Sequence, residues 1–492
     1  MKSSQHPLPF PAGQEKGDQQ IVQPLTLTAT REATWNQVSP SPGFWKGNSD
    51  PFHATPVALN PRNNEILRLA QQFVIFTAWP DTANAVFRTP IADTRNSHIK
   101  LDFAVQDEGL LHAILASGNR VSSGLTTIPR LPTVSQESVH KTRAVAILRH
   151  RLGSGETSPG VIALIRLLIS LEFDNDDPST ALLHLRGLLA MAMSNLALLQ
   201  EIEGLLLVCD VWIAMSLAKR PEISPTRYDP GARDLHDFNT TLINDVHFNA
   251  PTVLTSVRTI PQAVSPYGLD QPTVHLFNSA LEIVQTKALM TVIEDPFLQQ
   301  QVVKWMHRRA TAVSGYLMIG YVDATELMRI SNIKHPIDVR QSIIAASCLT
   351  AILFMNLEYC ESPSNYNFSK LFQKIEPILG SVADTMATTG SISDLELYLW
   401  LLFMCALGND VYSARGDISY SGWPAHLFHQ FRVQLHLDSL EHLKRLFHTF
   451  LYHDIIDDFL VGLLSLDTEN ISSSIISWPR WCTILHHYVP DR

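Results

Sequence analysis

Cysteine is scarce in this chain, and its placement limits the kinds of site that can be expected. The 492 residues include five cysteines, and no two of them form a Cys-x-x-Cys pair. An odd number of widely separated cysteines argues against a disulfide scaffold and a cysteine zinc site, and indicates a reducing compartment. Four of the five stand in apolar runs, where a free thiol behaves as a small hydrophobic side chain: Cys209, Cys348, Cys405 and Cys482.

Charged residues are also few, and acidic residues outnumber basic ones. Charged residues make up 17% of the chain, against about 25% in a typical soluble protein, and 37 Lys and Arg face 47 Asp and Glu, for a net charge of -10. Such a chain lacks the positive surface that non-specific phosphate binding needs. We interpret its two densest basic stretches, residues 141–151 and the "HRR" of residues 307–309, as solvated helix faces. A partner-binding role is the alternative.

Several targeting and catalytic motifs are missing as well. The first twenty residues hold no apolar segment of a secretory signal, so we expect an intracellular protein. The longest uncharged run has 17 residues, lies between Arg340 and Glu358, and contains several polar residues. It is short for a membrane span, and we predict a buried core helix there. Without a nucleophile elbow, a Gly-rich dinucleotide loop or a Walker loop, we expect no catalytic, cofactor-binding or metal-ligating residues, and no cofactor.

The first 55 residues differ from the rest of the chain. They contain seven prolines and six glutamines, four basic and four acidic residues, and little apolar periodicity. A segment of this composition buries too little apolar surface to offset the entropy of ordering it. We therefore predict a disordered arm over residues 1–55, followed by a structured domain over residues 56–492.

Helix signals dominate the rest of the sequence. Asn60 followed by Pro61 is typical of a helix start, and apolar residues then recur at spacings of three and four. Alternating strand patterns are scarce. The sequence predicts an all-α, multi-helix, bundle-like domain. Beyond four helices expected between residues 60 and 175, further helices are predicted near residues 195–219, 274–292, 297–319, 339–358, 366–388, 393–408, 424–435 and 439–462.

The acidic stretch from Asp174 to Asp177 could be a metal site or a turn between two helices. An EF-hand loop that began at Asp174 would place Pro178 at position 5 and Leu185 at position 12, where oxygen ligands are required. Asp177 and Pro178 instead suit the N-cap and the first position of a helix. We predict a helix–turn–helix connection of a generic kind.

Two further groups of polar residues could carry chemistry. In "HDIIDDF", Asp454, Asp457 and Asp458 run in the reverse of the Asp-Asp-x-x-Asp order that terpene cyclases use to hold magnesium. Among the C-terminal histidines, His426 and His429 have a spacing at which two ligands share one helix face. We favour structural roles for both groups. A helical, metal-dependent enzyme of terpenoid or related secondary metabolism remains the alternative.

The region of residues 221–273 shows no strong periodicity. Long connections within compact domains are often functional, although this one could simply cross the surface of the helical bundle. We favour the second interpretation.

Four stretches, in this order, resemble the fungal-specific transcription factor domain of zinc-cluster regulators. The third is the most similar, because the family repeatedly shows an apolar helix, an acidic turn and a His-Leu-x-Gly helix, here His184, Leu185, Arg186 and Gly187. The four stretches are "SDPFHATPVALNPRNNEILRLAQQFV" (residues 49–74), "DEGLLHAILASGNRV" (107–121), "VIALIRLLISLEFDNDDPSTALLHLRGLLAMA" (161–192) and "LYLWLLFMCALGN" (397–409).

The resemblance implies an all-α regulatory or effector domain in the nucleus, with a transcription regulator's role and no catalysis. The regulators of this family carry an N-terminal cluster of six cysteines, whereas the first cysteine here is Cys209. We therefore expect this chain not to bind DNA sequence-specifically by itself. Its expected partners are the transcription machinery or a related zinc-cluster regulator, and a small-molecule effector is possible. For Gly187 we expect a close contact between two helices, since glycine within a helix costs about 1 kcal/mol relative to alanine. A ligand or partner surface is the alternative.

Overall fold

The computed structural model describes residues 55–57, 59–67, 106–125, 136–194, 196–249, 269–290, 293, 295–331, 338–359, 365–413, 423–451 and 457–464. The chain divides into two units at Pro51 and Phe52, and every described residue belongs to the second unit. In these residues all the regular structure is helical, which confirms the all-α prediction. The predicted arm lies outside the described residues, apart from Thr55.

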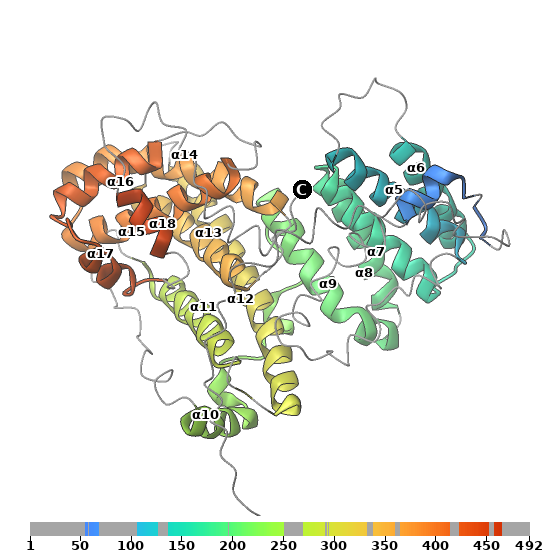
Figure 1. The fold of residues 1–492 in the computed structure, drawn as a ribbon, viewed down its shortest axis with the longest axis horizontal. Helices are drawn as coiled ribbons and strands as arrows, with labels where there is room; N and C mark the ends of the chain where they lie inside the picture. Colours follow the sequence, from blue (N-terminus) through green and yellow to red (C-terminus); the bar gives the residue numbers. More distant parts are fainter. Residues whose placement is uncertain are drawn as a thin grey trace, which may run out of the picture. The chain divides into compact units, whose positions relative to one another are not determined.

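A first core is built by the helices at the N-terminal side of the described chain. They are the short helix of residues 61–67, α5 (Glu108–Leu125), α6 (Gln136–Gly153), α7 (Pro159–Asp174) and α8 (Pro178–Met193). Figure 1 shows α7 and α8 side by side, and they contact one another closely. The inward faces of α5, α7 and α8 place leucines such as Leu111, Leu164 and Leu185 in the core with no exposed surface.

A second, larger core is built by the helices that follow. Its centre is α13, whose residues from Ser342 to Met355 are all buried, and this confirms the core helix predicted between Arg340 and Glu358. These helices are α10 (Asp237–Asn249), α11 (Gln271–Met290), α12 (Pro296–Ser331), α13 (Val339–Tyr359), α14 (Asn365–Thr389), α15 (Ile392–Ser413), α16 (Trp423–Gln434), α17 (Leu440–Phe447) and α18 (Asp457–Leu464).

The helix α9 (Leu196–Leu217) belongs to both cores. Its Leu206 and Ile213 pack with the first core, whereas Val211 and Met215 pack with the second. Among the side chains of α9 that the structure describes, most are buried or half-buried. The Nζ of Lys374, from α14, donates to the carbonyl oxygen of Ser216 at 3.2 Å, so a positive charge lies at the negative end of the helix.

The acidic stretch from Asp174 to Asp177 forms the predicted turn between α7 and α8. The Oδ1 of Asp177 accepts a hydrogen bond from the backbone N–H of Thr180 at 3.0 Å, and Pro178 stands at the first helical position. At the start of α7, the hydroxyl of Ser158 accepts from the N–H of Val161. The N-cap predicted at Asn60 is also confirmed, since its Oδ1 accepts from the N–H of Asn63 at 2.8 Å.

The helices differ from the predicted ones in three places. The helix expected over residues 439–462 is two helices, because α17 ends at Phe447 and α18 begins only at Asp457. The helix expected over residues 297–319 continues to Ser331. The region of residues 221–273, for which no helix was predicted, contains α10.

Two glycines within helices have opposite surroundings. Gly187 in α8 is exposed and has no neighbouring atom within 4 Å of an added Cβ, so the predicted close helix contact is wrong. Gly408 in α15 is buried, and an added Cβ would overlap the ring of Phe372 from α14. At this second position the absence of a side chain lets two helices pack closely.

We predict that the same substitution has opposite effects at these two positions. Gly187→Ala should raise the free energy of unfolding by up to about 1 kcal/mol, because alanine favours the helix and meets no neighbour. Gly408→Ala should lower it by about 1–3 kcal/mol, because the methyl group collides with the Phe372 ring. Urea unfolding followed by circular dichroism measures both, and effects of the same sign would contradict this account.

A histidine pair is buried between α5 and α6. The Nδ1 atoms of His112 and His140 lie 2.8 Å apart, so one ring donates and the other accepts. Burial lowers the pKa of both rings, that of His140 to about 4 with a further contribution from His112. Glu108 raises the pKa of His112, whereas Arg143 lowers it further. The fold therefore favours the neutral pair.

We predict that this pair makes stability depend on pH in acid. The unfolded histidine pKa is about 6.5, so the stabilisation is present above that pH and is lost as pH falls towards about 4. His140→Gln removes the contribution of His140, so the stability difference from the natural chain should shrink by about 2–3 kcal/mol between pH 7 and pH 4. His442→Gln, which removes an exposed histidine of α17, is the control for urea unfolding across this range. A difference that stays constant with pH would contradict the prediction.

Candidate functional site

The most concentrated polar network in the described part of the chain surrounds an irregular segment between α9 and α10. We call residues 221–236 the strap. It contains two short 3-10 turns, η3 (Pro225–Arg227) and η4 (Arg233–Leu235), and contacts α12. Because its backbone groups have few partners in regular structure, they need side-chain partners where they are buried.

A buried aspartate of α9 holds the beginning of the strap. The carboxylate of Asp210, which is 1% exposed, accepts from the N–H of Glu222 at 2.9 Å and from the N–H of Ile223 at 2.7 Å. Burial raises the pKa of Asp210 to about 6, while the two N–H donors act in the opposite direction. The two backbone bonds fix the direction in which the chain leaves α9.

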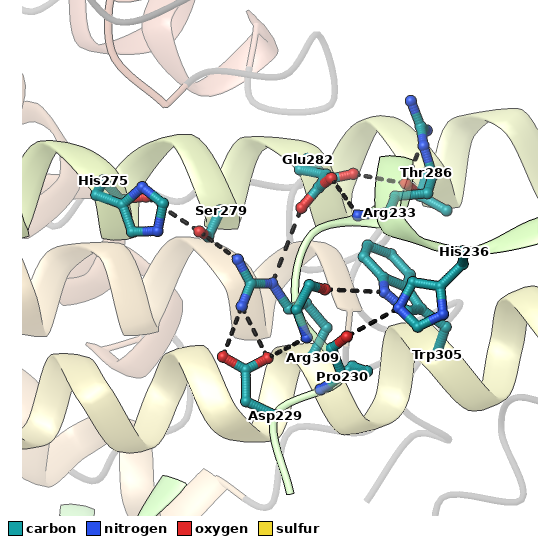
Figure 2. Close-up of polar contacts among 11 residues, drawn as sticks. Asp229, Pro230, Arg233, His236, His275, Ser279, Glu282, Thr286, Trp305 and Arg309 are labelled. Atoms are coloured by element: carbon teal, nitrogen blue, oxygen red, sulfur yellow. Dashed lines mark hydrogen bonds and ion pairs between the residues drawn. The ribbon is translucent and has the colours of Figure 1, made fainter. Parts of the chain in front are cut away.

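The middle of the strap is held by a buried arginine of α12. Arg309 donates through Nη1 to both carboxylate oxygens of Asp229, at 2.8 and 2.7 Å. Its Nη2 donates to the hydroxyl of Ser279 at 2.7 Å, and its Nε lies 3.8 Å from Oε2 of Glu282, both on α11. Figure 2 shows the guanidinium between these three partners. The Arg309 side chain is only 6% exposed, so each of these charges depends on the others for compensation.

The end of the strap is held by α11 and α12 together. The other carboxylate oxygen of Glu282 accepts from the backbone N–H of Arg233 at 2.8 Å, and the Arg233 Nη1 donates to the hydroxyl of Thr286 at 3.0 Å. The indole Nε1 of Trp305 donates to the carbonyl of Gly231 at 3.1 Å. Glu282 therefore bridges Arg309 and the strap backbone, as Figure 2 shows.

Aromatic residues in the middle and at the end of the strap complete the network. The ring of His236 bonds the carbonyl oxygen of Pro230 at 2.9 Å and stacks on Phe238. Tyr228 is inserted beside Leu207 of α9 and Ala312 of α12, in a small apolar cluster of its own. Its hydroxyl is buried and has no hydrogen-bond partner among the described residues, and burial raises the pKa of Tyr228. Tyr228 therefore contributes mainly apolar packing.

The arrangement resembles a structural clamp more than a reaction centre. The network contains two cations, Arg309 and Arg233, and two anions, Asp229 and Glu282. Arg309 donates to Asp229 and lies beside Glu282, and Glu282 also accepts from the backbone N–H of Arg233. The described residues include no group of three or more His, Cys, Asp or Glu side chains that could hold a metal ion. What the geometry can do is fix the strap against three helices.

The prediction for residues 307–309 is wrong at its third position. Arg308 is partly exposed and pairs with Glu203 of α9 at 2.6 Å, but Arg309 is buried in the strap network. The basic residues on α6 fall into two groups. Lys141 pairs with Glu172 and Arg151 pairs with Asp107. The remaining basic side chains of the stretch are exposed.

The polar residues His184 and Arg186 of the 161–192 stretch each pair with a glutamate. Glu172 of α7 is 1% exposed and accepts from the Nζ of Lys141 at 2.5 Å, and the Nε2 of His184 lies 3.6 Å from its other oxygen. Glu172 thereby connects α6, α7 and α8. Arg186 lies at the surface and pairs with Glu222 of the strap at 2.6 Å.

The other candidates do not come together as a site. His426 is exposed on α16, whereas His429 is buried at 2% exposure beside Phe428. The carboxylate of Asp457 pairs with Lys444 of α17. Asp454 lies outside the described residues, and the side chain of Asp458 is not among those described.

The strap network was not predicted from the sequence, because its partners are far apart in the chain. Asp229 and Arg309 are separated by 80 residues. The available signal was an arginine within the otherwise apolar periodicity of α12, together with an acidic, proline-containing segment that could supply its partner.

Comparisons with known proteins identify no relative. No protein-family model, no curated protein and no solved structure matches this chain. Among the helices that the structure describes, none has the length and apolar character to cross a membrane.

We predict that two adjacent arginines differ sharply in their contribution to stability. Arg309→Met leaves Asp229 and Glu282 partly buried without their cation and should lower the free energy of unfolding by about 3–5 kcal/mol. Arg308→Met removes a partly exposed pair at the surface and should cost no more than about 1 kcal/mol. Urea unfolding of the two variants tests this difference. Equal effects would show that the strap network does not hold the fold as described.

Proposed function

We propose that this chain is a transcription regulator-like protein that acts through its α-helical domain. It binds protein partners, namely the transcription machinery or a related zinc-cluster regulator, and a small-molecule effector is a further possible ligand. It neither contacts DNA sequence-specifically by itself nor catalyses a reaction. The proposal takes its biological content from the resemblance to the fungal-specific transcription factor domain.

The observation that carries the proposal is the hairpin of α7 and α8. The stretch with the greatest resemblance, residues 161–192, covers nearly all of this hairpin, including the acidic turn. Its His184 meets the buried Glu172 across the two helices at 3.6 Å. The residues that resemble the family therefore belong to one packed unit, which supports a common architecture better than scattered matches would.

Two of the other three stretches also fall on packed helices. Residues 107–121 coincide with most of α5, which contributes Leu110, Leu111 and Ile114 to the first core. Residues 397–409 lie within α15, where Trp400 is fully buried and donates through Nε1 to the carbonyl of Leu451 at 2.9 Å. Residues 49–74 are described only in part.

The polar network supports a binding role over a catalytic one. A general base or nucleophile needs a polar atom that a substrate can reach. In the strap network the Arg309 guanidinium and its partners are engaged with one another at 2.7–3.8 Å. Such a network stabilises one arrangement of three helices, which suits a domain whose surface is recognised by others.

A tethering experiment tests the proposal. We expect the full chain, fused to an unrelated sequence-specific DNA-binding domain, to change transcription of a reporter several-fold. The same chain without the fused domain should leave the reporter unchanged, since it does not reach the DNA alone. A fluorescent fusion in the same cells should concentrate in the nucleus.

Two variants control for folding in this experiment. Leu185→Asp places a charge in the first core, where Leu185 has no exposed surface, and should abolish the effect. Val433→Asp changes a side chain that is 58% exposed on α16 and should retain it. Reporter activity equal to that of the DNA-binding domain alone would contradict the proposal. So would magnesium-dependent turnover of a prenyl diphosphate by the purified chain.

A further inference from the structure

The chain between the end of α9 and the buried part of the strap lies at the surface. We call residues 219–224 the entry segment, and each of them is exposed or half-buried. They follow Ala218, whose backbone has a φ of 52°, a left-handed conformation that strains a residue other than glycine. They precede Pro225, which is buried next to Gly315 of α12. The entry segment is therefore fixed at both ends and has water on its outer side.

Two surface ion pairs join the entry segment to neighbouring helices. Arg220 pairs with Asp323 of α12, and Glu222 pairs with Arg186 of α8. Pairs as exposed as these contribute little to stability, because water screens the charges and the long side chains lose freedom. The buried contact with Asp210 therefore decides whether the entry segment stays in place.

The carboxylate of Asp210 lies beneath the entry segment with no cation to balance its charge. Its two oxygens accept the backbone N–H groups of Glu222 and Ile223, and in the described part of the chain no ion pair joins it to a Lys, Arg or His. An ionised carboxylate taken out of water without a cation is unfavourable. Outward movement of the entry segment would return this carboxylate to water.

Four other ionisable groups surround Asp210. On the strap, Glu222 is a like charge that raises the pKa of Asp210, and Asp210 is, after burial, the largest cause of the raised pKa of Tyr228. Burial raises the pKa of the neighbouring Cys209 thiol, Arg166 of α7 lowers it, and Asp210 raises it. For Asp210 itself burial is the largest effect and exceeds that of the two N–H donors, so its pKa is about 6.

We propose that ionisation of Asp210 opens the entry segment and that protonation closes it. Closed means that both N–H bonds to Asp210 are made, and open means that they are broken and the carboxyl group is hydrated. The closed arrangement has the higher pKa, so a bound proton stabilises it. As pH rises through about 6, the buried charge forms and opening becomes more favourable. Compared with an ordinary carboxyl group, this raises the opening equilibrium by up to about 100-fold.

The proposal makes the entry segment a pH-dependent connection. Through it α9 is joined to α8 by Glu222 and to α12 by Arg220. Opening would loosen these connections between weakly acidic and neutral pH. The middle and the end of the strap would stay in place, because Arg309 and Glu282 hold them independently of Asp210.

Hydrogen exchange of the full chain tests the proposal, because the amides of Glu222 and Ile223 are protected only in the closed arrangement. After correction for the intrinsic effect of pH on exchange, their protection should fall by up to about 100-fold between about pH 4.5 and pH 7.5. The amide of Arg233, which donates to Glu282 at the end of the strap, should show no such fall. It also reports any opening of the whole domain.

Three variants identify the group responsible. Asp210→Asn cannot ionise, so the pH dependence should disappear. Glu222→Gln removes the like charge at an exposed position, where folding is not at risk, and the fall in Ile223 protection should move to lower pH. Asp323→Asn, which removes the partner of Arg220, is the matched control and should leave the midpoint unchanged.

Three results would overturn the proposal. The first is protection of Glu222 and Ile223 that, relative to Arg233, stays constant or rises with pH. The second is a pH dependence that persists in Asp210→Asn. The third, which holds even if that variant does not fold, is a midpoint in Glu222→Gln equal to that of Asp323→Asn.

Discussion

The bidentate pair of Arg309 and Asp229 is the interaction on which the surroundings of α9 depend. A chain that leaves a buried helix without regular structure must find partners for its backbone before it can cross neighbouring helices. Here the guanidinium of α12 fixes Asp229, Glu282 lies beside that guanidinium, and Glu282 in turn holds the backbone of Arg233. Three helices and the strap thus share one set of opposite charges.

This arrangement explains why a charged network is tolerated at such a place. Each ion taken out of water costs several kcal/mol unless its partners restore the lost hydration. The Arg309 guanidinium has a carboxylate on two sides and a hydroxyl on the third. The cost of burial is therefore offset only in the folded arrangement, which disfavours alternatives in which the strap runs elsewhere.

Much of the fold could be predicted from the sequence because local signals decide it. Asn60 and Asp177 each cap the helix that follows, as their positions beside Pro61 and Pro178 predicted. The apolar periodicity predicted the core helices, and α13 is buried as its run of apolar residues indicated. These features depend on neighbours within a few residues, which a single sequence displays directly.

The errors occur where distant residues decide the outcome. Nothing near Gly187 in the sequence shows that it faces outward, and nothing near Arg309 shows that a carboxylate 80 residues away will bury it. The side-chain network that holds the strap was missed for the same reason. Its side-chain partners come from α9, α11 and α12, and only the folded chain brings those helices together.

The contact of Gly408 with Phe372 has a consequence for how this sequence can change over generations. The ring occupies the volume that any side chain at position 408 would need. A larger residue there becomes acceptable only after the ring at position 372 has been replaced by something smaller, and the two changes must arrive in that order. In descendants of this chain the two positions should therefore vary together, as one inherited unit, although they belong to different helices.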